Sequence, residues 1–447
     1  MSNKTPLAVI ILAAGKGTRM KSDQPKVMHT LCGLPMINWL LKTVEKLTPQ
    51  KVIIVTGPDM HDLEAAVVPH DTVVQHTRNG TGGAAKIAAD ALGDFDGDVL
   101  ILLGDAPLLK HSTLEKLITT RHGNDIGLSM LACDVSDPTG YGRVILDANN
   151  IVQKIIEHKD ADQDERAVTT MNAGAFCVDG KYLNTWLSRI TDDNAQGEFY
   201  ITDLPQIATA DGFKTRATIT NDECEIQGCN TLIDLAAMEH TARVRLCHDH
   251  MRAGVRIIDP ANTYIHYDAK IVAGSIIEPH VVIGAGVSLA KNVTIKPFSH
   301  IEGVQVQECA SIGPYARIRP GTTIGENAKV GSFVDMKKST IGNNSKVPHL
   351  SYIGDSVIGD NVNIGAGAIT ANYDGYNKFQ TTIEDNVMVG VNVNLVAPVT
   401  VKAGSFVAAG STITKNVPAD ALGIARERET FVDGWAKEYH DQKKKRE

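Results

Sequence analysis

The chain has 447 residues, a formal net charge of −8, and 43% hydrophobic against 21% charged residues. Its length is that of roughly three globular domains, and its composition excludes disordered and collagen-like classes. The acidic balance argues against a general nucleic-acid binder, so any phosphate-bearing ligand must be met by locally placed cations.

The apolar runs and cysteines indicate the compartment. The longest apolar runs, such as Leu7–Ala14, fall far short of the roughly 20 residues that span a bilayer, so we expect no transmembrane segment. None of the seven cysteines is spaced C-x-x-C, and Cys224 and Cys229 come closest without a second ligand pair. Reduced thiols of a cytoplasmic protein fit this pattern best.

Residues 1–229 alternate between apolar runs and helical stretches. The runs Ala8–Leu12, Val52–Val55 and Val99–Leu103 predict buried strands, and Met36–Leu47 predicts a helix. Strand–helix alternation at this spacing is typical of a mostly parallel α/β sheet.

The loop after the first strand, Leu12–Met20, combines small residues with cations. Small residues let backbone N–H groups approach phosphate oxygens, and Lys16, Arg19 and Lys26 supply positive charge. An ordinary glycine turn is the alternative. The loop is no Walker motif, and Met20 stands where the dinucleotide fingerprint has its third glycine.

Asp105 follows the apolar run Val99–Leu103 by two residues. Ligands of open α/β sheets bind where parallel strands end, and a carboxylate there suits Mg²⁺. The alternative, an N-cap for a helix starting near Ser112, is weakened by the distance along the chain.

Residues Asn230–Ala253 predict one long helix, a plausible connecting arm, with Leu232, Leu235, Met238, Ala242 and Leu246 on one face.

A six-residue period dominates the second half of the chain. It is neither the helical 3.6 nor the strand period of 2, and a short strand plus a tight turn, three per coil, explains it. At about 18 residues per coil, some 150 residues give about eight coils. The apolar positions are Ile265, Ile271, Ile277, Ile283, Leu289, Ile295 and Ile301; Ile312, Ile318, Ile324, Val330 and Met336; and Ile383, Val389, Leu395, Val401, Val407 and Ile413, with five-residue steps to Ile341 and from Ile353 to Ile358. The pattern resembles the left-handed parallel β-helix of acyltransferases.

The period breaks between Thr370 and Ile383, where residues 371–378 intrude. A solenoid accommodates such an insertion as a corner loop, and such loops commonly carry function. His349 has an imidazole suited to base catalysis, although a lone histidine on a β-helix is more often a structural surface residue. After the repeat, the tail from Ala419 predicts a solvated end.

Ordered motifs in both halves resemble one family. In the first half they are L-x-x-G-x-G-T-R-M from Leu12 with Pro25–Lys26, Gln75 with Gly80–Gly82, Leu103–Pro107, Asp137–Arg143, Glu157–Lys159 and Asn194–Glu198. In the second half they are Arg317–Gly321, Val334–Lys338, His349–Tyr352, Asn361–Gly367 and Asn372–Gly375. With the hexapeptide repeat, they resemble the bacterial bifunctional N-acetylglucosamine-1-phosphate uridylyltransferase/glucosamine-1-phosphate acetyltransferase family over essentially the whole chain.

The resemblance implies a Rossmann-like nucleotidyltransferase domain with a UTP site. Its nucleotide residues would be Leu12, Ala13, Ala14, Gly15, Lys26, Gln75, Gly80 and Thr81, with Arg19 and Lys26 acting on the phosphates. Gly140, Glu157, Asn172 and Asn230 would bind the N-acetylglucosamine moiety, and Asp105 with Asn230 would hold Mg²⁺. Leu103 stands where the family often has tyrosine.

The resemblance also implies an acetyl-CoA-dependent site on the β-helix. His349 would be the general base, with Arg319, Lys337 and Lys378 on the sugar phosphate and Tyr352 and Asn363 on the sugar. Asn372, at the sugar, also belongs with the acetyl-CoA positions Tyr373, Val391, Ala409 and Arg426. Val391 replaces a common serine of the family, which leaves a backbone N–H role there.

The implied organisation is a uridylyltransferase domain at 1–229, a linker helix at 230–253, a left-handed β-helix at 254–418 and a tail at 419–447. The implied activity is acetylation of glucosamine 1-phosphate, then uridylyl transfer to N-acetylglucosamine 1-phosphate, in a homotrimer that supplies cell-wall and lipopolysaccharide synthesis. Two alternatives remain: a pyrophosphorylase whose β-helix only assembles oligomers, and a non-catalytic scaffold. His349 and the intruding loop argue against a pure spacer.

Overall fold

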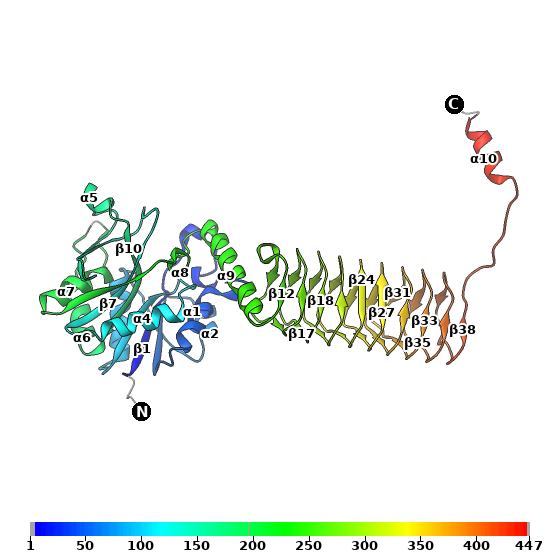
Figure 1. Ribbon diagram of the computed structural model, residues 1–447, viewed down its shortest axis with the longest axis horizontal. Helices are drawn as coiled ribbons and strands as arrows, with labels where there is room; N and C mark the ends of the chain where they lie inside the picture. Colours follow the sequence, from blue (N-terminus) through cyan, green and yellow to red (C-terminus); the bar gives the residue numbers. More distant parts are fainter. Residues whose placement is uncertain (1–4, 195, 445–447) are drawn as a thin grey trace. The chain divides into compact units, whose positions relative to one another are not determined.

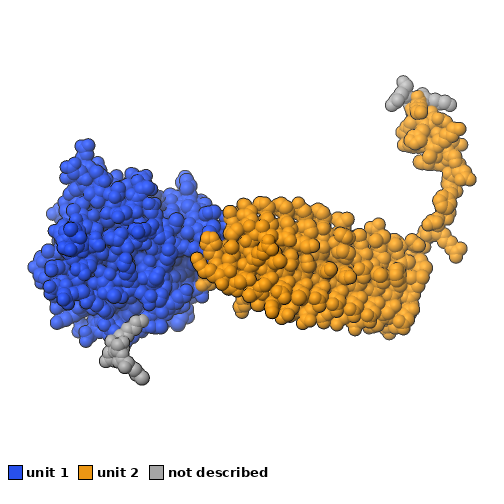
Figure 2. All heavy atoms as spheres, viewed as in Figure 1, with its two compact units in different colours: residues 1–245 blue, residues 246–447 orange. Residues whose placement is uncertain are grey.

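The computed structural model describes residues 5–194 and 196–444, so Ala195, within one of the family motifs, and the last three residues of the tail lie outside it. These residues form two compact units divided between Arg245 and Leu246 (Figure 2).

A nine-stranded, mostly parallel sheet organises the first unit (Figure 1). Its main path runs β11-β7-β10-β6-β1-β4-β5, with β10 antiparallel to β6 and β7, and β8 and β9 forming a side hairpin. The strands are β1 (Leu7–Leu12), β4 (Lys51–Thr56), β5 (Asp71–Val74), β6 (Asp98–Leu103), β7 (Ile126–Asp134), β8 (Arg143–Leu146), β9 (Val152–Ile156), β10 (Thr170–Asp179) and β11 (Lys214–Thr220); β2 (Thr30–Leu31) and β3 (Leu34–Pro35) pair separately. The predicted strands and sheet class are confirmed.

Helices cover both faces of this sheet. The helices are α1 (Met36–Glu45), α2 (His61–Ala66), α3 (Thr81–Leu92), α4 (His111–Arg121), α5 (Gln163–Arg166), α6 (Gly180–Leu187), α7 (Leu204–Ala210), α8 (Glu223–Ile226) and α9 (Leu232–Arg252). Side chains of β1 alternate between two cores: Val9 and Ile11 pack in the core of α1 and α4, and Ala8 and Ile10 in that of α3 and α6. Burial on both faces explains why β1 is wholly apolar.

The second unit is a three-sided parallel β-helix, as the six-residue period predicted. The first sheet holds β12 (Arg256–Ile257), β15 (Ile276–Ile277), β18 (Thr294–Ile295), β21 (Ser311–Ile312), β24 (Lys329–Ser332), β27 (Lys346–His349), β30 (Asn363–Ile364), β33 (Met388–Val389), β36 (Phe406–Val407) and β38 (Leu422–Gly423). The second holds β13 (Tyr264–Ile265), β16 (Val282–Ile283), β19 (His300–Ile301), β22 (Arg317–Ile318), β25 (Asp335–Lys337), β28 (Tyr352–Gly354), β31 (Ile369–Ala371), β34 (Asn394–Val396) and β37 (Thr412–Ile413). The third holds β14 (Lys270–Ile271), β17 (Ser288–Leu289), β20 (Val304–Val306), β23 (Thr322–Ile324), β26 (Thr340–Ile341), β29 (Ser356–Ile358), β32 (Thr381–Ile383) and β35 (Val399–Val401).

The periodic apolar residues form the interior of the prism. Ile277, Ile295, Ile312 and Val330 succeed one another in the first sheet, each at most 1% exposed. The expected corner loop is present: residues 372–380 leave after β31 and return before β32, and the coils on either side keep their register through Ser356 and Thr381.

Four stacked rings line one corner of the prism. His280, Phe298, Tyr315 and Phe333 have successive centroid distances of 4.9, 5.0 and 5.1 Å and nearly parallel planes. We call this set the aromatic column. The rings of Phe298, Tyr315 and Phe333 stay 47–59% exposed, and Leu350 occupies the next equivalent turn at 62%.

The tail leaves the prism after β38 and is exposed from Arg426 through α10 (Trp435–Lys444). Within the described part of the chain, no helix is both long and apolar enough to cross a bilayer.

Candidate active sites

The first candidate site lies where β1, β4 and β6 end. These strands are parallel neighbours, with Leu12 beside Val55 and Leu103, so the loops that follow them meet at one edge. The Ala13 N–H donates to the Val55 carbonyl and the Gly104 N–H to the Leu12 carbonyl, both at 2.9 Å. This edge is where open α/β sheets bind ligands.

A cavity of about 320 Å³ opens at this edge. Its lining includes every residue predicted for the nucleotide, together with Asp105: Leu12, Ala13, Ala14, Gly15, Lys26, Gln75, Gly80 and Thr81. Two glycines allow neighbouring segments to pack closely around this cavity. A Cβ at Gly17 (φ +64°) would lie 2.6 Å from the Lys26 Cβ, and one at Gly80 (φ +104°) would lie 2.5 Å from the Phe199 carbonyl oxygen.

Cations and oxygen ligands meet on one side of this cavity. The Lys26 Nζ forms an ion pair with Asp105 and lies 3.3 Å from the Asn230 Oδ1, which also accepts a 2.8 Å hydrogen bond from the Arg19 Nη2. The side chains of Lys26 and Asp105 are only 14% and 19% exposed. Three distant chain segments therefore converge on one charged cluster.

The chemistry of this cluster fits a hard cation. A carboxylate from Asp105 and an amide oxygen from Asn230 are the donors that Mg²⁺ prefers, and the Lys26 ammonium shows that the two oxygens attract positive charge. Burial, with Asp234 and Asp105 adding to it against the opposing Lys26, raises the pKa of the neighbouring Cys229 thiol to about 11. At neutral pH that thiol is therefore protonated.

Arg78 and Glu198, for which no role was predicted, also line the cavity. The Arg78 Nε donates to the Ala14 carbonyl at 2.8 Å, which holds the phosphate loop against the segment that carries Gln75. Gln75 is 3% exposed, and its Nε2 donates to the Asn79 Oδ1 and the Gly80 carbonyl. The position of Arg78 between two motif residues was the available signal.

Two of the predicted sugar residues, Asn172 and Glu157, meet at Gly142 as a second cluster, whereas Asn230 lies in the charged cluster with Lys26. The Asn172 N–H donates to the Gly142 carbonyl at 2.9 Å, and a Cβ at Gly142 would lie 3.3 Å from a carboxylate oxygen of Glu157. Gly140, two residues before, is exposed. Burial raises the pKa of the Glu157 carboxyl, although a hydrogen bond from Thr202 opposes the shift.

Residues 198–202 connect the two clusters. The Phe199 N–H donates to the Asn79 carbonyl, the Ile201 N–H to the Thr81 Oγ1, and the Thr202 hydroxyl to Glu157. One short segment thus positions both the nucleotide loop and the sugar carboxylate.

The β-helix residues lie on the outer surface over several coils. His349 ends β27 and is exposed, and among residues 5–194 and 196–444 its imidazole has no hydrogen-bond partner. Tyr352 and Asn363 lie on outer positions of β28 and β30, and the Asn363 Nδ2 lies 3.2 Å from the Met388 Sδ.

The cations predicted for the sugar phosphate occupy neighbouring coils and the corner loop. The Arg319 Nε forms a 2.9 Å ion pair with Asp335 of β25, the strand that also carries Lys337. Lys378 is exposed in the corner loop, which is closed by a hydrogen bond from the Phe379 N–H to the Asn372 carbonyl. Asn372 is buried, and its Nδ2 donates to Asp355 at 2.5 Å.

The residues predicted for acetyl-CoA continue toward the tail. Tyr373 is 60% exposed in the corner loop and Val391 is 47% exposed two coils away from Tyr352. The Val391 carbonyl accepts from the Gly410 N–H, next to Ala409, and a Cβ at Gly410 would lie 3.9 Å from the Arg426 Cδ. Val391, Ala409 and Arg426 are therefore neighbours.

Comparisons with known proteins match a different family model to each of the two compact units. Residues 9–170 match the MobA-like NTP transferase domain, and residues 300–422 match the GMPPB C-terminal domain. The chain is 44% identical over 437 residues to the bifunctional protein GlmU of Paramagnetospirillum magneticum, covering 98% of this chain and 97% of that protein. It is 42% identical to the bifunctional protein GlmU of Zymomonas mobilis over the whole of both chains. The corresponding protein of Sphingopyxis alaskensis is 43% identical, over 99% of this chain and 98% of its own.

Proposed function

This chain belongs to the family of bifunctional GlmU proteins, and from that premise we propose that its two units carry two reactions at separate sites. The chain acetylates glucosamine 1-phosphate with acetyl-CoA. It then transfers uridylyl from UTP to N-acetylglucosamine 1-phosphate, giving UDP-N-acetylglucosamine and pyrophosphate.

For uridylyl transfer, we assign UTP to the cavity at the strand edge. The backbone of Leu12–Gly15, with Gln75, Gly80 and Thr81, would hold the nucleotide, and Arg19 and Lys26 would contact its phosphates. Gly140, Glu157, Asn172 and Asn230 would hold the sugar. The bonds through residues 198–202 support this pairing, because they fix the two subsites together.

The reaction brings two anions together. A phosphate oxygen of the sugar phosphate attacks the α-phosphorus of UTP, a new P–O bond forms, and the bond to pyrophosphate breaks. Lys26 and Arg19 offset the repulsion between the reactants, and the cavity supplies their orientation. No protein nucleophile is required. We propose that Asp105 and Asn230 hold Mg²⁺, which when bound would neutralise phosphate charge.

For acetyl transfer, His349 would accept the proton of the sugar ammonium, so that the free amine attacks the thioester carbonyl and the CoA thiolate departs. Arg319, Lys337 and Lys378 would bind the sugar phosphate, and Tyr352 and Asn363 the sugar ring. Acetyl-CoA would contact Asn372, Tyr373, the backbone of Val391, Ala409 and Arg426.

We also propose that the chain acts as a homotrimer. The aromatic column is an exposed apolar strip that ends, through Leu350, beside His349. Such strips on soluble proteins commonly mark interfaces. Within the described part of the chain the exposed imidazole of His349 has no hydrogen-bond partner, and Lys378 is exposed as well. Both support a site that a neighbouring subunit completes, with Arg426 able to serve that neighbour.

The functional boundaries we propose are 1–229, 230–253, 254–418 and 419–447, in a cytoplasmic protein.

The convergence of Lys26, Asp105 and Asn230 at the cavity carries this proposal. Two assays on the wild-type protein test it: release of free CoA from acetyl-CoA and glucosamine 1-phosphate, and release of pyrophosphate from UTP and N-acetylglucosamine 1-phosphate with Mg²⁺. Pyrophosphate without free CoA would leave a pyrophosphorylase whose β-helix serves assembly alone.

A further inference from the structure

Asp105 and Asn230 belong to chain segments that meet through a backbone hydrogen bond. The Cys229 N–H donates to the Asp105 carbonyl at 2.9 Å, so the residue before Asn230 is tied to Asp105 itself. Asp105 lies in the loop between β6 and α4, and Asn230 lies between α8 and α9. A change in either segment therefore alters the separation of the two side chains.

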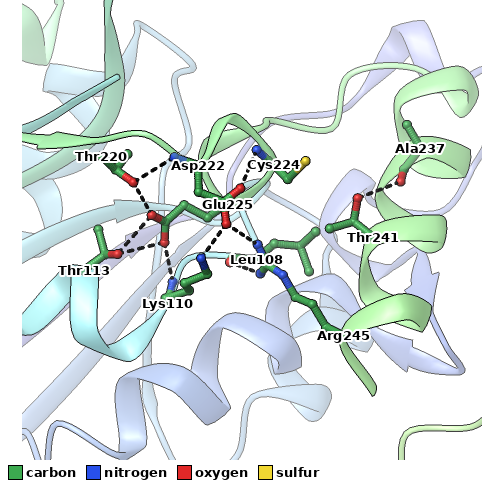
Figure 3. A network of polar contacts seen from close by, with 10 residues as sticks. All are labelled: Leu108, Lys110, Thr113, Thr220, Asp222, Cys224, Glu225, Ala237, Thr241 and Arg245. Carbon is green, nitrogen blue, oxygen red and sulfur yellow. Dashed lines mark hydrogen bonds and ion pairs between the residues drawn. The ribbon is translucent and has the colours of Figure 1, made fainter. Parts of the chain in front are cut away.

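Glu225 joins the same two segments a second time (Figure 3). Its carboxylate is 1% exposed and accepts hydrogen bonds from the Lys110 N–H at 3.1 Å, the Thr113 hydroxyl at 2.9 Å and the Thr220 hydroxyl at 2.5 Å. A buried carboxylate is costly unless its oxygens are satisfied, so these donors and Glu225 stabilise one arrangement. Two of them lie at the start of α4, directly after the Asp105 loop.

Arg245 of α9 holds the loop at a third point. Its Nη1 donates to the Leu108 carbonyl at 2.6 Å, and its Nη2 lies 3.3 Å from Asp222, which also pairs with the Lys110 Nζ at 2.5 Å. Burial tends to raise the pKa of Asp222, but the hydrogen bond and charge of Lys110, with the charge of Arg245, lower it overall. Asp222 is therefore anionic at neutral pH and keeps both cations in place.

The loop from Asp105 to Lys110 is thus fixed at three points within six residues. The Cys229 N–H bonds Asp105, Arg245 bonds Leu108, and Glu225 bonds the N–H of Lys110. All three partners come from residues 225–245, the stretch that also contains Asn230. In Figure 3 the side chains of Glu225, Lys110 and Arg245 converge on this loop.

We propose that Glu225 and Arg245 are positioning residues for uridylyl transfer, because they set the separation of Asp105 and Asn230 and hence the affinity for the divalent cation. The inference rests on the proposed function of that pair. Groups that orient metal ligands typically change metal affinity or activity by about 10–100-fold when removed.

Glu225→Gln tests this inference. The glutamine side chain keeps the shape of glutamate, but its NH₂ group replaces one acceptor oxygen and then faces the N–H and hydroxyl donors that Glu225 accepts from. We expect the Mg²⁺ concentration for half-maximal uridylyl transfer to rise about 10–100-fold. The KM for N-acetylglucosamine 1-phosphate and the acetyl-transfer rate should remain unchanged. Glu115→Gln, whose side chain is 55% exposed on α4, is the matched control and should behave as wild type.

A second readout needs neither metal nor turnover. In metal-free protein, the amides of Lys110 and Cys229 should exchange with deuterium faster in Glu225→Gln and Arg245→Met than in wild type. Arg245→Lys, which keeps the charge beside Asp222 but cannot bridge two acceptors, should restore part of the protection. Thr113→Val removes one donor to Glu225 with little change in volume, and should give a smaller effect in the same direction if Glu225→Gln does not fold.

Wild-type Mg²⁺ dependence and wild-type amide exchange in Glu225→Gln and in Thr113→Val would overturn the inference. A chain in which Asp105→Ala leaves the Mg²⁺ dependence unaltered would instead overturn the proposed metal role. Amide exchange still distinguishes these cases, because it reports the hydrogen bonds that fix the Asp105–Lys110 loop, and these form without the metal.

Discussion

The two candidate sites are built in opposite ways. In the first unit, Lys26 and Asp105 pair at a partly buried cavity, and Asn230, from a third distant segment, accepts a hydrogen bond from Lys26. On the β-helix, the candidate residues are spread over several strands, the corner loop and the tail, and His349 stands exposed without a hydrogen-bond partner among the described residues.

The difference follows from how each fold uses its residues. A doubly covered sheet brings loops together at one edge, so a single chain can enclose a ligand. A β-helix commits one or two residues of each short strand to the interior and leaves the rest outside, so one prism presents a flat face. In the proposed homotrimer, a neighbouring copy supplies the second wall for such a face.

The largest difference between the effects on the two activities should come from Asp105→Ala. Loss of the Asp105 carboxylate removes the counter-charge of Lys26 and one of the two proposed Mg²⁺ ligands. We therefore expect uridylyl transfer to fall by about 10⁴-fold. Acetyl transfer should persist. Pyrophosphate and CoA release measure the two rates, and Asp90→Ala, at an exposed carboxylate on α3, is the control. A parallel loss of both activities would contradict the separation.

His349→Ala should have the reverse effect. Without a base for the ammonium proton, acetyl transfer should fall by about 10³-fold while uridylyl transfer is retained. His300→Ala, on an exposed position of β19, controls for loss of a surface imidazole. An acetyl-transfer rate that is unchanged in His349→Ala would mean that another group takes the proton.

Glu157 gives the first site a distinctive pH dependence. Because burial raises its pKa above the ordinary 4.5, the carboxylate protonates earlier as the pH falls, and the KM for N-acetylglucosamine 1-phosphate should rise through that range. Glu157→Gln should raise this KM about tenfold at neutral pH, through loss of a charged acceptor, and remove the acid-side change.

The same shift affects stability with a defined sign. Between pH 4.5 and the raised pKa, the folded state binds more protons at Glu157 than the unfolded state, so the free energy of unfolding falls as the pH rises. Glu157→Gln should flatten that fall in denaturant titrations. A wild-type KM that stays constant from pH 4.5 to neutrality would contradict the assigned role.

The smallest effect is expected on the aromatic column. Phe333→Ala removes one end of the stack and should lower the free energy of unfolding of the β-helix by about 1 kcal/mol. It should also weaken self-association, which sedimentation velocity measures over a dilution series. Phe406→Ala, at a 45% exposed ring outside the column, is the control. Equal association of both variants would place the interface elsewhere.

The fold could be predicted from the sequence wherever apolar residues recur at a regular spacing or form an unbroken run. The isoleucines spaced by six residues predicted the prism interior, and the wholly apolar run at Ala8–Leu12 predicted a strand covered on both faces. The long helix expected at Asn230–Ala253 is α9, Leu232–Arg252. These patterns are local, so a single chain displays them.

Contacts between distant segments could not be predicted in this way. Glu223 and Glu225 lie in the same four-residue helix, yet Glu223 is exposed and Glu225 is 1% exposed with donors from three other positions. Nothing nearby in the sequence separates them, because their environments depend on where β11 and α4 lie in the finished sheet.

The corner loop has an evolutionary consequence. It leaves and re-enters the prism at one corner, and the strands on either side remain paired as though it were absent. Its exposed residues 373–378 can therefore vary in length and in side chain while the coils beneath keep their stacking. Selectivity for the acetyl acceptor can therefore diversify at that corner without any change in the packing of the prism interior.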